Sequence, residues 1–234
     1  MIKSQKIKEE VKQKYRTKET FDLIENFLEK QSQLSLIKKI SFEKELKEKT
    51  KDIFAKEREL GIIAISFCRL KNQYLFLNRV IETKLVYLMQ SMIFGLNNGN
   101  HLLLALSSRS LIEHVASLAY LIERTRKILE KTKGCTEYKS INENLKKLYT
   151  IYRKIFYGTR FFKNERLVEA MNVLTLIDKY LSSEIRDIRK YYDYLSDFAH
   201  PNFGSNVLVS SGALGGGIID PSIEEKKENN GHHY

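Results

Sequence analysis

The scarcity of proline constrains this chain more than any other feature of its sequence. Among 234 residues, only Pro201 and Pro221 are prolines. Proline disrupts helix interiors because it lacks a backbone N–H donor and its ring collides with the preceding turn. The residues before Pro201 therefore contain no position at which a proline forces a helix to stop. Long helices are favoured over a turn-rich β fold, and we expect an all-α protein.

Length and composition are typical of water-soluble globular proteins. With 42% hydrophobic and 29% charged residues, the chain is long enough for one substantial core. No charged-then-apolar leader pattern opens the sequence, and its most apolar run, residues 85–106, is interrupted by NNGNH at 97–101. Cys68 and Cys135 form neither a disulfide framework nor a zinc pattern. We expect a cytoplasmic protein with no membrane span, no metal and no cofactor.

The formal net charge of +11 is concentrated in the apolar middle of the chain. Residues 61–134 carry 10 basic and 4 acidic side chains. Such an excess favours polyanions such as RNA as partners, because binding releases the counterions of their phosphates. A lysine-rich genome would produce the same excess, so the charge alone does not identify a partner.

The distribution of apolar residues predicts three regions. Residues 1–60 are heavily charged, with sparse apolar residues at helical spacing, and predict one or two arm-like helices lying on the core or on a partner subunit. A frayed, solvated extension is the alternative. Residues 61–205 are far more apolar and predict a helical bundle. Residues 206–234 are glycine-rich and then polar, which predicts an irregular tail that begins as a hairpin or a packed loop.

Within the bundle we expect the longest apolar segment at residues 72–96, which is hydrophobic around most of its circumference. Such a helix is typical of the buried centre of a bundle. It should end at Gly95–Gly99, and Asn100 can cap the next helix. Further helices are expected at about 101–131, 139–157, 164–182 and 184–200.

A basic and aromatic stretch begins after residue 139. Its lysines and arginines interleave with tyrosines and phenylalanines, a composition that can bind nucleic-acid backbone and stack bases. The same segment fits a simple core stripe with its lysines in solvent. The residues of that stripe are Leu145, Leu148, Tyr152, Ile155 and Phe156. We favour the core stripe.

Arg109 and Glu113 interrupt a helix that is otherwise rich in leucine and alanine. The two residues are four positions apart, so they lie on the same helical face. Both charges must be paired or solvated, because burying either one alone is very costly. They therefore form an internal ion pair or face a polar cleft.

The segment 184–200 gathers a second set of polar residues. Arg189, Asp193, Ser196 and His200 share one stripe of the expected helix. The following proline disfavours helical geometry at His200, which should lie in the last turn or just past it. A protonated imidazole is favoured at that negative helix end, and histidine titrates near neutral pH. A polar helix end with a structural histidine is the alternative.

These two segments carry a resemblance to a known group of proteins. RSLIEHVASLAYL at 109–121 and YDYLSDFAHPN at 192–202 resemble a bacterial and archaeal helical family of unknown function. Its architecture is similar to the HEPN superfamily of nucleotide-binding helical bundles, many of which occur in toxin–antitoxin and phage-defence systems. The resemblance covers residues 60–205 and implies an up-and-down helical bundle that forms a homodimer.

The resemblance also implies catalytic roles. HEPN ribonucleases use an R-x(4–6)-H motif, which Arg109 and His114 match with four intervening residues. Arg109 would then steady the scissile phosphate, and His114 would act as a general acid or base without a metal. However, residues five apart on an unbroken helix point about 140° away from one another. Arg189 also lies too far from His200 to satisfy the motif.

A second arrangement brings the two segments together. A hydrogen bond between Glu113 and His200, with the carboxylate as acceptor, would orient the imidazole, while Arg109 would neutralise the acid or hold an anion. The group could be catalytic, could bind a nucleotide phosphate, or could be a buried polar network that enforces one packing. The candidate substrate-binding residues around it are Tyr192, Ser196, Arg189 and Asn202.

The function we predict from the sequence is that of a cytoplasmic defence or stress protein. It would bind RNA or a nucleotide in the cleft between the two motif helices, with metal-independent ribonuclease activity as an additional hypothesis. The alternative is a non-enzymatic interaction module, an antitoxin or assembly partner that uses residues 1–60 and the bundle to bind another protein.

Overall fold

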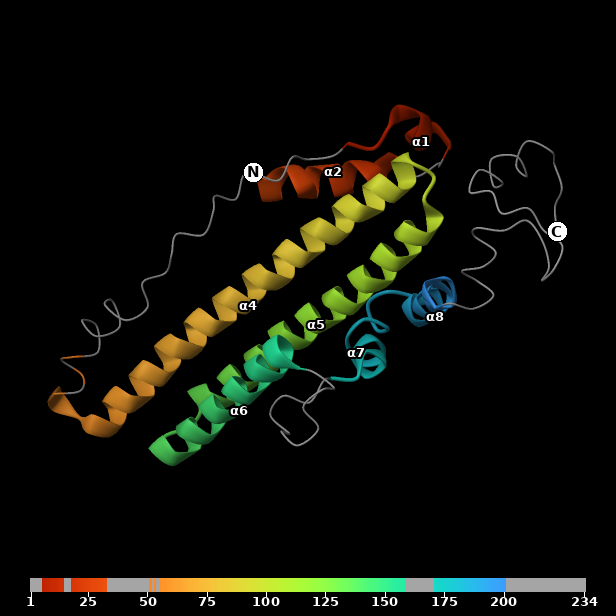
Figure 1. The fold of residues 1–234 in the computed structure, drawn as a ribbon. Coiled ribbons are helices and arrows are strands. Elements are labelled where there is room, and N and C mark those ends of the chain that lie inside the picture. The colour runs from red at the N-terminus through yellow and green to blue at the C-terminus, as the bar shows by residue number, and fades with distance from the viewer. Residues whose placement is uncertain are drawn as a thin grey trace. The chain divides into compact units, whose positions relative to one another are not determined.

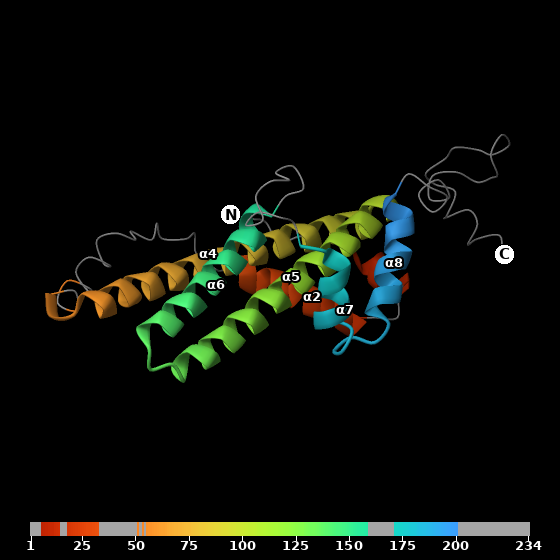
Figure 2. The same cartoon turned by 90° about the horizontal axis from the view of Figure 1, so that it is seen from below.

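The computed structural model describes residues 6–14, 18–32, 51, 53, 55–158 and 171–200. Within these ranges the regular secondary structure is helical and no strand occurs, so the expected all-α helical bundle is confirmed (Figures 1 and 2). The helices are α1 (Glu9–Lys14), α2 (Lys18–Ser32), α4 (Arg58–Asn97), α5 (His101–Lys133), α6 (Tyr138–Tyr157), α7 (Val173–Tyr180) and α8 (Ile188–Ala199).

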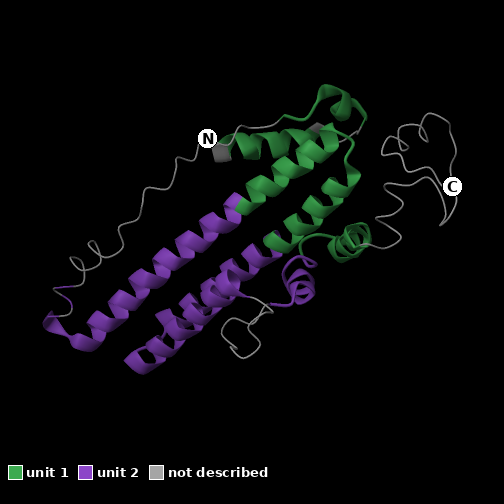
Figure 3. Ribbon diagram, in the orientation of Figure 1, with its two compact units in different colours: residues 1–35, 84–114, 184–234 green, residues 36–83, 115–183 purple. Residues whose placement is uncertain are grey.

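The chain divides into two compact units (Figure 3). Unit 1 comprises residues 1–35, 84–114 and 184–234, and unit 2 comprises residues 36–83 and 115–183. Helices α4 and α5 are each divided between the two units, with one segment in unit 1 and the other in unit 2. The region boundaries that we placed at residues 60 and 205 stay predictions, and the predicted tail lies outside the described residues.

The turn between α4 and α5 follows from a few residues. Gly99 adopts φ +61°, a left-handed conformation that glycine accepts without strain. Asn100 then caps α5, because its Oδ1 accepts a hydrogen bond of 2.9 Å from the Leu103 N–H. A Cβ atom added at Gly95 would lie 3.1 Å from the backbone nitrogen of Leu104. The predicted helix end and cap are confirmed, and the close approach of the two helices explains a glycine inside α4.

Helix α4 is not the fully enclosed centre that its composition predicted. Ile63, Leu70 and Leu77 are buried at seven-residue intervals, so one stripe of the helix enters the core. Large side chains on its other faces are exposed. They include Leu75, Phe76, Tyr87 and Phe94. The hydrophobic residues outnumber the positions that the core can cover, which is why composition overestimated the burial of this helix.

In unit 1, helices α1 and α2 pack on the C-terminal part of α4. Ile7, which precedes α1, and Phe21 and Leu28 of α2 meet Val86 and Ile93 of α4 in one buried core cluster. Helix α1 contributes the partly buried Val11. The Asn97 side chain joins the elements by accepting from the Lys8 N–H at 2.9 Å and donating to the Lys6 carbonyl at 2.9 Å. Of the alternatives for the arm, the described residues 6–14 and 18–32 fit the first, because they lie on the core of unit 1 in their own chain.

In unit 2, helix α6 largely follows the expected core stripe. Leu145, Leu148 and Tyr152 are buried, whereas Phe156 is exposed against our expectation. Helix α7 begins at Val173, where Asn172 Oδ1 accepts a hydrogen bond of 3.0 Å from the Leu174 N–H. The part of the predicted 164–182 helix that precedes residue 171 lies outside the described ranges.

Candidate polar cluster of α5 and α8

Tyr192 on α8 is the centre of a polar cluster in unit 1. Its hydroxyl donates a hydrogen bond of 2.7 Å to Glu113 Oε1, and it accepts contacts of 3.4 Å from both Nε and Nη2 of Arg109. Arg109 Nε also lies 3.4 Å from Glu113 Oε1. The guanidinium carbon stands 5.5 Å from the centre of the Tyr192 ring, a cation–π distance. We call Arg109, Glu113 and Tyr192 the polar cluster.

The local fold explains why these three residues meet. The polar side chains of Arg109 and Glu113 lie one turn apart on the same face of α5. Tyr192 is only 4% exposed, and a tyrosine suits this position because its ring fills apolar space while its hydroxyl reaches a partner. Donation thus runs in one direction, from the guanidinium to the phenol and from the phenol to the carboxylate.

Burial raises the pKa of Tyr192 above its ordinary value. The hydrogen bond from Arg109 lowers the pKa and the bond to Glu113 raises it, so these two effects oppose each other. The phenol is therefore neutral at physiological pH and keeps the proton that it donates to Glu113.

The polar cluster is accessible on its charged side. The side chains of Arg109 and Glu113 are 25% and 28% exposed, so both charges are partly hydrated. The contacts to Tyr192 and Glu113 use Nε and Nη2 of the guanidinium, which carries five N–H donors in all. The remaining donors can bind an anion that approaches from solvent.

His200 is not part of the polar cluster. The predicted Glu113–His200 hydrogen bond is wrong, because Glu113 accepts the Tyr192 hydroxyl and His200 ends α8 as an exposed residue. Helix α8 crosses α5 rather than running alongside it (Figures 1 and 2). His200 lies eight residues beyond Tyr192, or about 12 Å further along the α8 axis. Its backbone is extended, as expected before a proline.

His114 also points away from Arg109. Helix α5 is unbroken from His101 to Lys133, so a spacing of five residues separates the two side chains around the helix. The Nδ1 atom of His114 instead lies 2.8 Å from the Ser110 carbonyl oxygen of its own helix. Arg109 and His114 therefore lie on different faces of α5, and the ribonuclease hypothesis stays a prediction.

The remaining candidate residues bond within α8 or lie outside the described ranges. Ser196 Oγ donates 2.8 Å to the Tyr192 carbonyl, and Arg189 Nε lies 3.0 Å from each carboxylate oxygen of Asp193. Asn202 lies outside the described residues. Sequence reasoning thus found the three members of the polar cluster but paired Glu113 with the wrong partner. The signal that could have selected Tyr192 is its position four residues after Ile188, since these two residues form the buried stripe of α8.

Two features bear on broader classes of function. No group of three or more histidine, cysteine, aspartate or glutamate side chains gathers to hold a metal within the described part of the chain. Of the helices described, α5 is long and apolar enough to cross a membrane by length and composition, a property that core helices of water-soluble proteins share. No protein-family model, no curated protein and no solved structure matches this chain.

Proposed function

We propose that this protein binds a phosphate group of RNA or of a nucleotide at the polar cluster. The observation that carries the proposal is the Arg109 guanidinium, which contacts a buried tyrosine and a carboxylate through Nε and Nη2 while its side chain stays 25% exposed. Arginine presents its N–H groups in a rigid fork that matches phosphate oxygens. Holding the guanidinium in place before binding reduces the side-chain entropy that binding would otherwise cost.

Glu113 gives the polar cluster a second role in this proposal. It reduces the attraction of Arg109 for any single anion, so tight binding requires further positive charge around the ligand. The net charge of +11 is consistent with a polyanion that makes several contacts, which favours RNA over an isolated small anion. The proposal contains no catalytic step, because neither His114 nor His200 faces the polar cluster.

The resemblance to HEPN proteins supplies the biological setting of the proposal. A cytoplasmic protein that binds RNA in a toxin–antitoxin or phage-defence system, acting as a homodimer, would fit both the motif segments and the charge. The alternative of a protein-interaction module through residues 1–60 receives less support. Ile7 and the apolar residues Phe21 and Leu28 of α2 are already buried in the core of unit 1.

The test is a salt titration of RNA binding. Fluorescence anisotropy of a labelled single-stranded RNA would be measured for the wild type, for Arg109→Gln and for Lys190→Gln, which removes an exposed charge from α8. If Arg109 binds a phosphate, its loss reduces the slope of log K against log salt by about 0.7. Lys190→Gln should leave that slope nearly unchanged, and the RNA should stay intact.

The proposed contact would be refuted if Arg109→Gln had the same slope of log K against log salt as the wild type while circular dichroism showed the variant to be folded. Cleavage of the RNA in the presence of a chelator would refute the non-catalytic form of the proposal. Comparing Arg109→Gln with His114→Ala would then show whether the cleavage depends on the arginine–histidine motif.

A further inference from the structure

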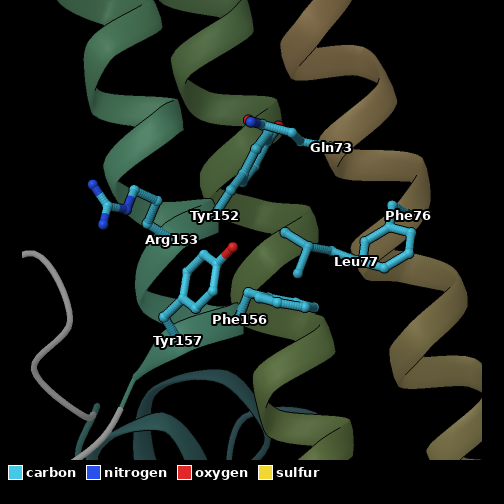
Figure 4. A pocket seen from close by; sticks show the side chains of 7 residues that line it. All are labelled: Gln73, Phe76, Leu77, Tyr152, Arg153, Phe156 and Tyr157. Carbon is cyan, nitrogen blue, oxygen red and sulfur yellow. The ribbon is translucent and has the colours of Figure 1, made fainter. Parts of the chain in front are cut away.

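A cavity of about 320 Å³ lies between α4 and α6 in unit 2 (Figure 4). Gln73, Phe76 and Leu77 line it from α4, and four residues of α6 line it from the other side. Those four residues are Tyr152, Arg153, Phe156 and Tyr157. We call this space the aromatic cavity. Its volume is near the lower end of the range for small-molecule sites, so it suits one ring system rather than an extended ligand.

Three rings at the aromatic cavity are exposed although they are large and apolar. Phe76, Phe156 and Tyr157 are 47%, 44% and 56% exposed. Phe76 and Phe156 lie 5.6 Å apart between ring centres, and Phe156 meets Tyr157 edge-to-face at 4.7 Å. These mutual contacts hold the rings in place while leaving apolar faces uncovered. A planar ring entering the cavity would cover those faces and gain aromatic contacts.

Gln73 supplies an unused hydrogen-bonding group in the wall. Its Oε1 atom is shielded from solvent and has no donor among the described residues. The neighbouring polar group, the Tyr152 hydroxyl, is already bonded to Thr125 Oγ1 at 3.2 Å. A shielded carbonyl without a donor is unfavourable. Rotation about the last side-chain bond exchanges the places of Oε1 and Nε2, and the proposed site needs this rotation to bring the oxygen to a ligand N–H.

Arg153 supplies a positive charge at the edge of the aromatic cavity. Its guanidinium carbon lies 5.7 Å from the Tyr149 ring centre and 5.9 Å from that of Tyr157. The side chain is turned outward, away from α4 (Figure 4). These two rings are the partners described for this guanidinium, and neither removes its positive charge. The cation–π contacts fix its position without neutralising it.

We propose that the aromatic cavity binds a small heteroaromatic acid, a planar molecule with a ring N–H and one carboxylate. The ring would lie against Phe76, Phe156 and Tyr157, the N–H would donate to the Gln73 carbonyl, and the carboxylate would extend outward to Arg153. This site lies in unit 2 and is independent of the polar cluster in unit 1. It therefore does not require the protein to bind RNA.

Indole-3-acetate is the probe for this site, because the chain contains no tryptophan. Indole fluorescence excited at wavelengths that tyrosine does not absorb therefore comes from the ligand alone. We expect saturable binding by the full-length protein. Wild-type protein should bind 1-methylindole-3-acetate, which lacks the N–H, about fivefold more weakly than indole-3-acetate. The Gln73→Leu variant should bind indole-3-acetate more weakly than the wild type does, by a similar factor.

The charge is tested with Arg153→Gln and a matched control. Arg153→Gln should weaken indole-3-acetate binding about tenfold or more but leave binding of uncharged indole unchanged. Lys147→Gln removes one exposed charge from the same helix outside the aromatic cavity and should bind like the wild type. Phe156→Leu, which keeps an apolar side chain without the ring, should weaken both ligands.

Three results would overturn the proposal. They are absence of saturable binding, equal affinity for the methylated and unmethylated acids, and equal losses in Lys147→Gln and Arg153→Gln. RNA binding separates this site from the proposed function. Gln73→Leu should retain the RNA salt slope of the wild type, and Arg109→Gln should retain indole-3-acetate affinity. Loss of both activities in either variant, with the fold intact, would contradict the independence of the two sites.

Discussion

Removing one hydroxyl group tests whether the polar cluster stabilises unit 1. Tyr192→Phe keeps the buried ring and its cation–π contact with Arg109, but it deletes the 2.7 Å hydrogen bond to Glu113. A hydrogen bond to a charged group contributes about 1.5–3 kcal/mol. Because the Glu113 side chain is 28% exposed, water can replace part of this interaction. We expect a loss of about 1–2 kcal/mol in the free energy of unfolding.

The assay is urea denaturation followed by far-UV circular dichroism, with a double-mutant cycle. Tyr192→Phe, Glu113→Ala and the double variant give the coupling free energy between the two side chains. Tyr194→Phe is the matched control, because it removes an exposed hydroxyl from the same helix and should change stability by less than about 0.5 kcal/mol. The reasoning would be refuted if Tyr192→Phe lost no more free energy of unfolding than Tyr194→Phe, or if the coupling free energy between Tyr192 and Glu113 were near zero.

The pH dependence of the same variant gives an independent check. The folded-state pKa of Tyr192 is raised, first of all by burial, so folding favours the neutral phenol. Its contribution to stability is complete below a pH of about 10, the unfolded pKa of tyrosine, and is lost as pH rises through the folded pKa. Tyr192→Phe should therefore lose less stability than the wild type on alkaline titration. If the free energy of unfolding of Tyr192→Phe fell as steeply with rising pH as that of the wild type, the raised pKa assigned to Tyr192 would be contradicted.

Two further changes test the packing of unit 1. Burial raises the pKa of Glu25, but bonds that include a 2.9 Å contact with Lys12 lower it overall, so its stabilising contribution is lost as pH falls through the folded pKa. Glu25→Gln should be less stable at neutral pH, and its free energy of unfolding should fall less steeply with decreasing pH than that of the wild type. An equally steep fall in both proteins would contradict this. Gly95→Ala places a methyl group against the Leu104 backbone and should cost about 1–3 kcal/mol, whereas Gly134→Ala meets ordinary contacts and should be nearly neutral. Equal melting temperatures of the two glycine variants would show that the helices adjust.

Local signals in the sequence were sufficient to predict much of the fold. The absence of early prolines predicted long helices, and the glycines and Asn100 located the turn between α4 and α5. These features act within a few residues of one another, so their effect can be derived without a tertiary structure. The pairing of α1 and α2 with α4 could not be derived in that way, because packing on the core, packing on a partner subunit and a frayed extension all fitted the same sequence.

The candidate site shows where such reasoning stops. A helical stripe identifies the residues that share one face, but it does not give the angle at which two helices cross. Tyr192 and His200 both belonged to the predicted site, and the crossing of α8 over α5 allows only Tyr192 to reach Glu113. The aromatic cavity was missed for a similar reason. Phe156 fitted a core stripe, and its exposure depends on how α6 meets α4.

The discontinuous make-up of unit 1 has a consequence for the newly made chain. A ribosome delivers the protein from its N-terminus, and Tyr192 follows Glu113 by 79 positions. Until α8 has been translated, Glu113 lacks the phenol that donates to it in the folded protein. Every segment of unit 2 leaves the ribosome before the last segment of unit 1, since unit 2 ends at residue 183. Translation order thus makes the arrival of one tyrosine the step that closes the polar cluster.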